Sequence, residues 1–227
     1  MYKKNLNWFQ ILQILVPIDR YLNNSGIHKA FKILNSFYKG SRLLVFDKNQ
    51  KSGFWSVPLA WEVKKAILQD PAGKIIADYK KNPLYVFTNS VSFQGLVNKK
   101  DLIKNHVFTD KHRPSIIPFH FRNSFRENVK EWGFSIPFNL VKKLPDGKYK
   151  VDIQTSMKKS NLYSSYYEKK GKIKDSILFV SHFDHPHQLN DGISGTFASY
   201  ELLKKLKNKK FTYAGLATPE IIGSIFF

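Results

Sequence analysis

The chain has no cysteine among its 227 residues, and only 17 acidic residues stand against 37 lysines and arginines. Without cysteine, neither a disulfide framework nor a thiolate metal site can form, so any metal has to bind through His, Asp or Glu. The lack of disulfides also fits a reducing compartment, and we expect a cytoplasmic protein.

Long hydrophobic runs are lacking as well. The most apolar stretch, residues 6–18, is too short to span a bilayer and is interrupted by Asn7, Gln10 and Gln13. It also lacks the small-residue cleavage site of a secretion signal. We therefore expect an amphipathic packing helix here and no transmembrane segment.

The scarcity of acidic residues leaves a net charge of +20. Such a charge raises the question of a nucleic-acid or anionic-membrane partner. The excess is mostly lysine, spread along the chain with no arginine-rich tract or recognition motif. This pattern favours a compositional origin and makes nucleic acid an unlikely partner, although nucleic-acid binding with a steep salt dependence stays an alternative.

The hydrophobic pattern changes twice along the chain. Residues 6–16 and 27–37 have helical periodicity, and Pro17 ends the first helix. The middle of the chain contains short β-type runs separated by turn residues, at 43–46, 66–68, 74–77, 84–87 and 148–155.

The last part of the chain reads as an α/β unit. The continuous apolar run at 176–181 predicts a buried parallel strand, followed by a helix over 194–206 and a strand over 211–217. Open α/β sheets bind ligands at the carboxyl ends of their strands. Polar residues at the end of the first strand are therefore candidates for a site.

A cluster of potential metal ligands directly follows the first of these strands. Imidazole nitrogens and carboxylate oxygens are good zinc ligands, and within ten residues the chain offers His182, Asp184, His185, His187 and Asp191. We expect His182 to bind metal, with Asp184 either accepting a hydrogen bond from its other ring nitrogen or supporting the site nearby.

Two further carboxylates extend this cluster. Asp191 precedes the predicted helix and is placed to bind or bridge metal, and Glu220 follows the next strand and reaches the same sheet edge. Two simpler interpretations remain open: the histidine-rich segment is a solvated loop, and Asp191 only caps the helix.

Two motifs resemble a known family. Residues 181–186 (SHFDHP) and 190–195 (NDGISG) look like the bacterial aminopeptidase-like family associated with polysaccharide biosynthesis, which is itself similar to zinc aminopeptidases. Those enzymes share a His-x-Asp motif and an Asp-x-x-Ser-Gly motif whose Asp bridges two metals. The resemblance extends upstream, through residues 17–20 (PIDR), 54–58 (FWSVP), 70–76 (DPAGKII), 117–119 (IPF) and 132–134 (WGF).

The resemblance implies a three-layer, zinc-exopeptidase-like α/β core. Residues 1–43 and 165–227 would form this core, and a mostly β domain over 44–164 would be inserted in it. One or two zinc ions would be held by His182, Asp191 and Glu220, with His185 as an alternative ligand and Asp184 supporting the site. The expected substrate is a small peptide-like or glycoconjugate molecule with an amide bond.

Two departures from the family pattern bear on activity. The chain ends before the segments from which related enzymes take further ligands, including a distal histidine, so we expect a truncated and incomplete core. Zinc aminopeptidases also carry a glutamate general base where this chain has Pro219, and proline cannot accept a proton. We therefore expect a hydrolase that is inactive or incomplete as this fragment; the alternative is a non-catalytic module that binds a ligand or partner.

Overall fold

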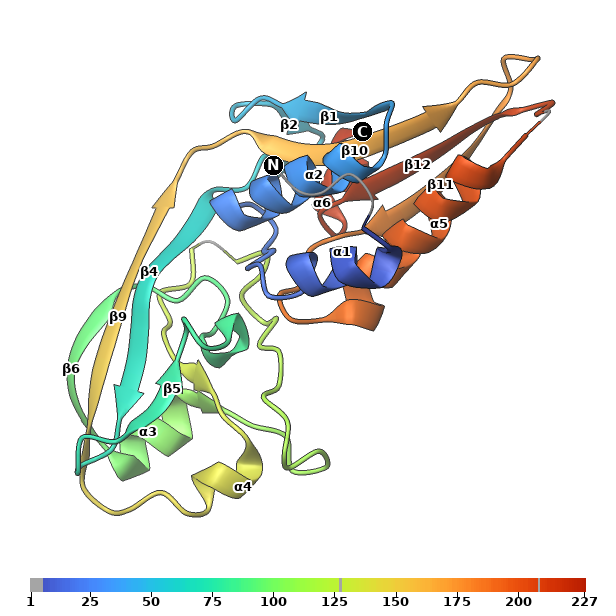
Figure 1. The fold of residues 1–227 in the computed structure, drawn as a ribbon. Helices are drawn as coiled ribbons and strands as arrows, with labels where there is room; N and C mark the ends of the chain where they lie inside the picture. The colour runs from blue at the N-terminus through green and yellow to red at the C-terminus, as the bar shows by residue number, and fades with distance from the viewer. Residues whose placement is uncertain (1–5, 127, 208) are drawn as a thin grey trace. The chain divides into compact units, whose positions relative to one another are not determined.

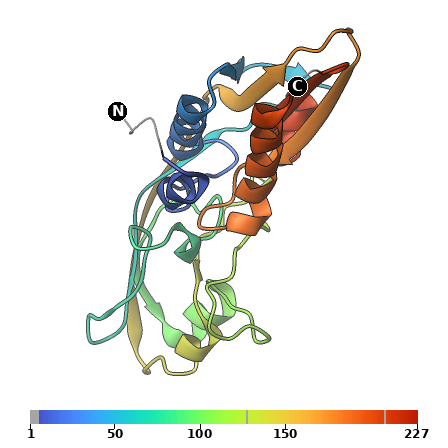
Figure 2. The ribbon, with the colours of Figure 1, turned by 45° about the vertical axis from the view of Figure 1, so that its right-hand side comes forward.

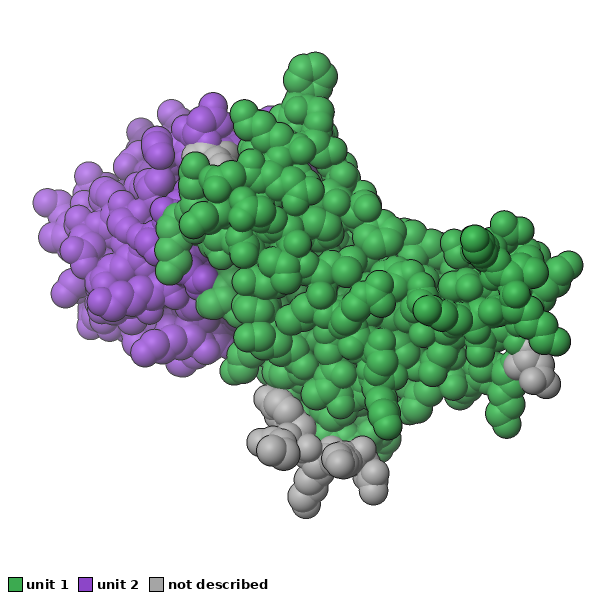
Figure 3. All heavy atoms as spheres, turned by 90° about the horizontal axis from the view of Figure 1, so that it is seen from above, with its two compact units in different colours: residues 1–60, 158–227 green, residues 61–157 purple. Residues whose placement is uncertain are grey.

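The computed structural model describes residues 6–126, 128–207 and 209–227 and divides the chain into two compact units (Figure 3). Unit 1 comprises Met1–Ala60 and Lys158–Phe227, and unit 2 comprises Trp61–Met157. Unit 2 is shorter at both ends than the predicted insertion over 44–164. The difference arises because β1 (Ser41–Phe46) pairs along its whole length with β10 (Leu162–Lys169), which keeps both strands in the sheet of unit 1.

The sheet of unit 1 has four strands in the order β1-β10-β12-β11 (Figure 1). The strand β12 (Thr212–Thr218) is antiparallel to β10 and parallel to β11 (Ser176–His182). The helix between the two parallel strands, α5 (Ser194–Lys205), is the crossover that a parallel pair requires. The predicted α/β unit is thus confirmed.

Three helices cover one face of this sheet. The helices α1 (Trp8–Leu15) and α2 (Ser25–Phe37) lie next to one another (Figures 1 and 2), and both share a hydrophobic core with α5. Asparagines start both N-terminal helices: Asn7 forms a capping box with Gln10, and the Asn24 side chain accepts the amide of Ile27 at 2.8 Å. Local capping therefore sets where these helices begin, and burial of their apolar sides holds them on the sheet.

The alternation of side chains along β10 separates two cores. Tyr167 faces the helices, where its ring lies 5.4 Å from that of Tyr200 on α5. Leu162 faces the other side and packs with Phe46 and with Phe226 of α6 (Ile222–Phe226). Unit 1 therefore has helices on both faces of its sheet.

The predicted burial of β11 is wrong. This strand lies at the edge of the sheet, next to β12, and Ile177, Leu178 and Val180 are 40%, 38% and 53% exposed. Its continuous apolar run is typical of a parallel strand with neighbours on both sides. Within the described part of the chain, β12 is the neighbour that β11 has, so the apolar pattern gave the strand direction correctly but not its burial.

Two short strands, β2 (Lys51–Ser52) and β3 (Trp55–Ser56), form a hairpin in unit 1. Unit 2 has its own four-stranded sheet in the order β5-β4-β9-β6. Its strands are β4 (Ala60–Gln69), β5 (Ile75–Asp78), β6 (Phe93–Asn98) and β9 (Lys148–Lys158). The smaller elements are α3 (Lys99–Asn105), α4 (Phe138–Val141) and the parallel pair of β7 (Val107–Phe108) and β8 (Phe134–Ser135).

The strand expected at 84–87 is wrong. Pro83–Tyr85 forms a 3-10 turn instead, because the side chain of Asn82 accepts the amide of Leu84 at 2.9 Å and the proline ring restricts the backbone. None of the helices described for this chain combines the length and apolar character needed to cross a membrane.

Unit 2 buries a histidine in an aromatic stack. The ring of His120 lies parallel to that of Phe87 at 3.8 Å and edge-on to that of Phe108 at 5.3 Å. Burial, and secondarily the charge of Arg122, lower the pKa of His120 to about 4, although Glu131 opposes the shift. The imidazole is therefore neutral in the folded protein at neutral pH.

This environment predicts acid sensitivity of unit 2. A folded pKa below the unfolded value of about 6.5 gives stability that is present above pH 6.5 and lost as the pH falls toward 4, on the order of 2–3 kcal/mol. Urea unfolding between pH 7.5 and 4 should show this loss. His120→Phe should remove much of the pH dependence, whereas substitution of the exposed His112 by Gln should not. Equal pH dependence in all three proteins would contradict the assignment.

Candidate metal centre

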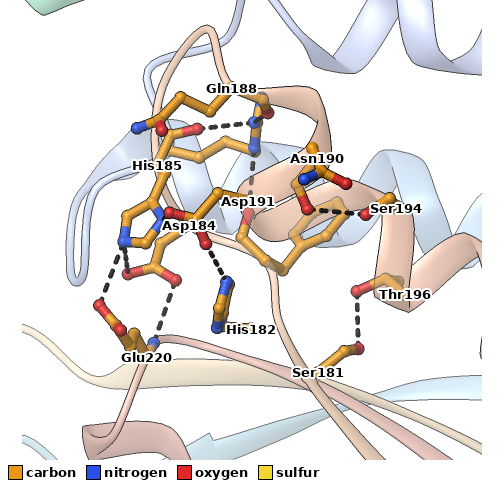
Figure 4. Close-up of polar contacts among 12 residues, drawn as sticks. Ser181, His182, Asp184, His185, Gln188, Asn190, Asp191, Ser194, Thr196 and Glu220 are labelled. Carbon is orange, nitrogen blue, oxygen red and sulfur yellow. Dashed lines mark hydrogen bonds and ion pairs between the residues drawn. The ribbon is translucent and has the colours of Figure 1, made fainter. Parts of the chain in front are cut away.

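The parallel pair β11 and β12 brings the candidate residues to one sheet edge. His182 is opposite Thr218 in the register, and both strands end at this pair. One further bond, from the amide of Phe183 to the carbonyl of Thr218 at 2.9 Å, continues the pairing past the strand ends. His182 and Glu220, which are 38 positions apart in the sequence, therefore emerge at the same place (Figure 4).

The loop after β11 turns back over this edge and carries Asp191 with it. An irregular turn over Leu189–Ile193, with non-helical backbone angles at Asp191 and Gly192, leads into α5. Asp191 points toward His182, with 2.7 Å between its Oδ1 and the ring Nε2 (Figure 4). The N-cap position of α5 is Ile193, and its end has no side-chain cap. The interpretation of Asp191 as a helix cap is therefore wrong.

His185 lies at the centre of the cluster. Its Nδ1 is 3.2 Å from Oδ2 of Asp191, its Nε2 is 3.2 Å from Oε2 of Glu220, and its ring centroid is 5.2 Å from that of His182. Its side chain is only 9% exposed. The sequence suggested His185 only as an alternative ligand, but it is the residue that connects the two strand ends.

Asp184 supports Glu220 and not His182. Its Oδ1 accepts the backbone amide of Glu220 at 3.0 Å, and its Oδ2 is 3.8 Å from Nε2 of His185. Because the chain turns sharply at His185 (φ 74°), Asp184 points toward the end of β12, whereas Nε2 of His182 is taken by Asp191. Burial raises the pKa of Asp184 to about 6, although His185 and the amide of Glu220 lower it.

A strained turn sets the position of Glu220. Ile221 has φ 58° and ψ −65°, and the amide of Ile222 donates to the carbonyl of Glu220 at 2.5 Å, which makes a γ-turn. This conformation is rare, and it is costly for a β-branched residue. Strain of this kind persists where surrounding contacts impose it, often at functional sites. No periodicity or motif in the sequence signals this turn.

The cluster opens into a cleft of about 470 Å³. The cleft lies over the ends of β11 and β12 and the start of α5, and its lining includes His182, Asp191, Ser194, Pro219, Glu220 and Ile221. Side chains of Asp191 and Glu220 are 55% and 40% exposed, so they are accessible to a ligand in this cleft.

The donor atoms fit a zinc ion in chemistry and in spacing. Two overlapping groups have their donor atoms within 4.8 Å of one another: His182, His185 and Asp191, and Asp184, His185 and Glu220. Ligand atoms of a tetrahedral zinc at roughly 2.0–2.1 Å lie about 3.3 Å apart. The Nδ1 of His185 lies 3.2 Å from Asp191 and its Nε2 lies 3.2 Å from Glu220, each close to this separation. A given zinc ion can take only one of the two ring nitrogens, so each contact belongs to a different donor group. His187 lies outside both groups, and its amide donates to the carbonyl of Val16.

Solved structures assign the fold to the class of zinc-aminopeptidase-like peptidases. A zinc aminopeptidase from Bacillus subtilis superimposes with a TM-score of 0.54 at 11% identity, over 96% of this chain and 62% of that one. A peptidase M28 precursor from Shewanella amazonensis gives 0.54 at 10% identity, over 95% and 65%. At such identities the likeness concerns the fold alone.

More similar proteins narrow this class. A crystallised putative peptidase from Clostridium acetobutylicum has a TM-score of 0.84 and 28% identity, over 96% of this chain and 51% of that one. A protein of the same species, described as "Putative polysaccharide biosynthesis protein with aminopeptidase-like domain", is 30% identical over 96% of this chain and 49% of its own length. Residues 60–156 match the domain of unknown function DUF2172. The predicted family resemblance is thus confirmed, and the chain spans about half the length of these relatives.

The loop geometry depends on Gly192. Its φ of 127° disfavours other residues, and a Cβ there would lie 2.4 Å from the carbonyl oxygen of Asp184. We expect Gly192→Ala to destabilise the protein by about 2 kcal/mol or more and to weaken metal binding, as measured by thermal unfolding and zinc titration. Gly53→Ala is the matched control, because Gly53 also has a positive φ (57°) but faces open space. Equal effects of the two changes would contradict this role of the loop.

Proposed function

We propose that this chain is the metal-binding part of a zinc-dependent, aminopeptidase-like hydrolase that acts on a peptide-like or amide bond. The observation that carries this proposal is the convergence of two imidazoles and three carboxylates on one sheet edge, with 3.2 Å between His185 and each of two carboxylates. The similarity to proteins described as peptidase and aminopeptidase-like supports the same conclusion.

The side chains at this site have different proposed roles. His182, Asp191 and Glu220 would be zinc ligands, as the resemblance implies, with His185 as a further ligand. His182 and Asp191 share one donor group with His185, and Glu220 shares the other with His185 and Asp184. Asp184 holds the backbone amide of Glu220 and thereby keeps that carboxylate directed at the cleft. Bound zinc would supply Lewis-acid polarisation of a carbonyl group and a water of lowered pKa. The open cleft beside Asp191 and Glu220 leaves room for a small peptide-like substrate.

The position of the general base, which would accept the proton during hydrolysis, differs in this chain. The resemblance expects a general base at Pro219, which lines the cleft but has no group that accepts a proton. We therefore propose that this chain binds metal and does not turn over substrate efficiently. The same residue favours a second candidate function, a non-catalytic module that binds a peptide-like or glycoconjugate ligand.

Zinc binding is the first test. We expect the purified chain to bind zinc in equilibrium dialysis, and His185→Gln or Asp191→Asn to weaken binding at least about tenfold, since each change removes a ligand atom. His112→Gln is the matched control, because this exposed histidine lies in unit 2 and outside both donor groups. If the unaltered chain binds no zinc, or if the variants bind as it does, the proposed function is wrong.

Hydrolysis separates the two candidate functions. With zinc, cobalt or manganese and aminoacyl p-nitroanilides as substrates, we expect no chelator-sensitive turnover by the unaltered chain. Pro219→Glu should produce such turnover if the site is a hydrolase that lacks only its base, by roughly the 10²–10⁴-fold that a general base contributes. Chelator-sensitive turnover by the unaltered chain would reject the non-catalytic alternative. An inactive Pro219→Glu variant that still binds zinc would favour it.

A further inference from the structure

One arginine of unit 1 is completely buried beneath the loop that carries the candidate ligands. Arg20 lies between α1 and α2 and is 0% exposed. All three of its guanidinium nitrogens donate hydrogen bonds to backbone carbonyl oxygens. A side chain of this kind is typical of a residue that organises backbone and does not contact solvent.

The acceptors belong to two segments that are more than 160 residues apart. On the loop, Nε donates to Phe183 at 3.0 Å, and Nη2 donates to His185 at 2.8 Å and to Gln188 at 3.0 Å. On the N-terminal side, Nη1 donates to the carbonyls at the end of α1 and just after it, namely Leu15, Val16 and Ile18. One guanidinium therefore ties the end of α1 to the loop.

The loop needs such a support because its backbone is strained. His185 and His187 have positive φ values of 74° and 54°, which few non-glycine residues adopt. Such conformations persist only when surrounding contacts impose them. The carbonyls that Arg20 binds are those of Phe183, His185 and Gln188, which lie on both sides of Asp184 and around these two turns. Loop carbonyls that are buried this way also require donors.

The positive charge of Arg20 interacts with nearby carboxylates. Asp184 and Asp19 are the carboxylates whose charges act on the guanidinium, and Asp184 is itself almost fully buried. Burial lowers the pKa of Arg20 to about 10, so it stays a cation at neutral pH. The guanidinium is bonded to the carbonyls of Phe183 and His185, the residues on either side of Asp184 in the sequence.

We infer that Arg20 is a positioning residue of the candidate metal centre: it holds the loop backbone so that Asp184 and His185 face Glu220 and Asp191. The inference rests on the proposed zinc site. Lysine keeps the charge but has no planar fork, so it cannot bond both segments in this geometry. A role in stability alone would predict that zinc affinity follows overall stability.

The experiment compares Arg20→Lys and Arg20→Gln with Leu34→Ala. Leu34 is a fully buried residue of α2 in the same core, and its truncation destabilises unit 1 without touching the Arg20 contacts. In zinc titration calorimetry we expect at least a tenfold loss of affinity for both Arg20 variants and less than a twofold loss for Leu34→Ala. Equal losses at equal melting temperature would overturn the inference.

Hydrogen exchange followed by mass spectrometry, without zinc, provides a second readout. The amides of residues 183–185, 187 and 188 should exchange at least tenfold faster in Arg20→Lys than in the unaltered chain, and those of β10 should not. This outcome supports the positioning role even if the unaltered chain binds no zinc, which would refute only the proposed function. Unchanged exchange in the loop would overturn the inference.

If neither Arg20 variant folds, a measurement on the unaltered chain still tests the inference. Zinc should slow exchange of the Arg20 Nε proton, observed by NMR, because an occupied site would restrain the loop that this proton is bonded to. No slowing on zinc binding would overturn the inference.

Discussion

The parallel pairing of β11 with β12 is the constraint on which the candidate site depends. Its register sets His182 opposite Thr218, so the residues that follow the two strands meet at one edge. A shift by one residue would turn every side chain of β11 to the other face of the sheet and separate His182 from Glu220. Tyr200 and Leu203 of α5 pack against Gly215 of β12, so the same pairing also sets where the crossover helix lies.

Backbone strain is concentrated around this edge. Of the four non-glycine residues with positive φ in the described part of the chain, three, His185, His187 and Ile221, lie in the segments that follow β11 and β12. Two of the positive-φ positions adjoin candidate ligands: Ile221 follows Glu220 in a γ-turn, and Gly192 follows Asp191 and lies against the carbonyl of Asp184. The fold thus imposes on these segments a geometry that they would not adopt alone.

The candidate site is rich in acidic residues, whereas the chain as a whole is basic. The protein carries a net charge of +20, yet three of its 17 acidic residues, Asp184, Asp191 and Glu220, lie around one histidine. Burial of Asp184 in such a group is costly unless cations compensate for it. Asp184 is among the charges that act on the buried Arg20, and the open cleft leaves Asp191 and Glu220 accessible to a metal ion. The overall basic charge therefore says little about what this site binds.

Local pattern was enough to predict helices over 6–16 and 27–37, which the structure has at 8–15 and 25–37. It also predicted the strand–helix–strand order of the last part and the cluster of ligand types, since each depends on residues close together in the chain. The burial of β11 and the strand expected at 84–87 were predicted wrongly, and of the two contacts considered for Asp184 the structure has the one with a neighbouring segment of the site, the amide of Glu220. The central place of His185 and the contacts of Arg20 arise between segments more than 30 and 160 residues apart. Such contacts follow from strand register and from turns that hydrophobic periodicity does not encode. They are therefore visible only in the tertiary structure.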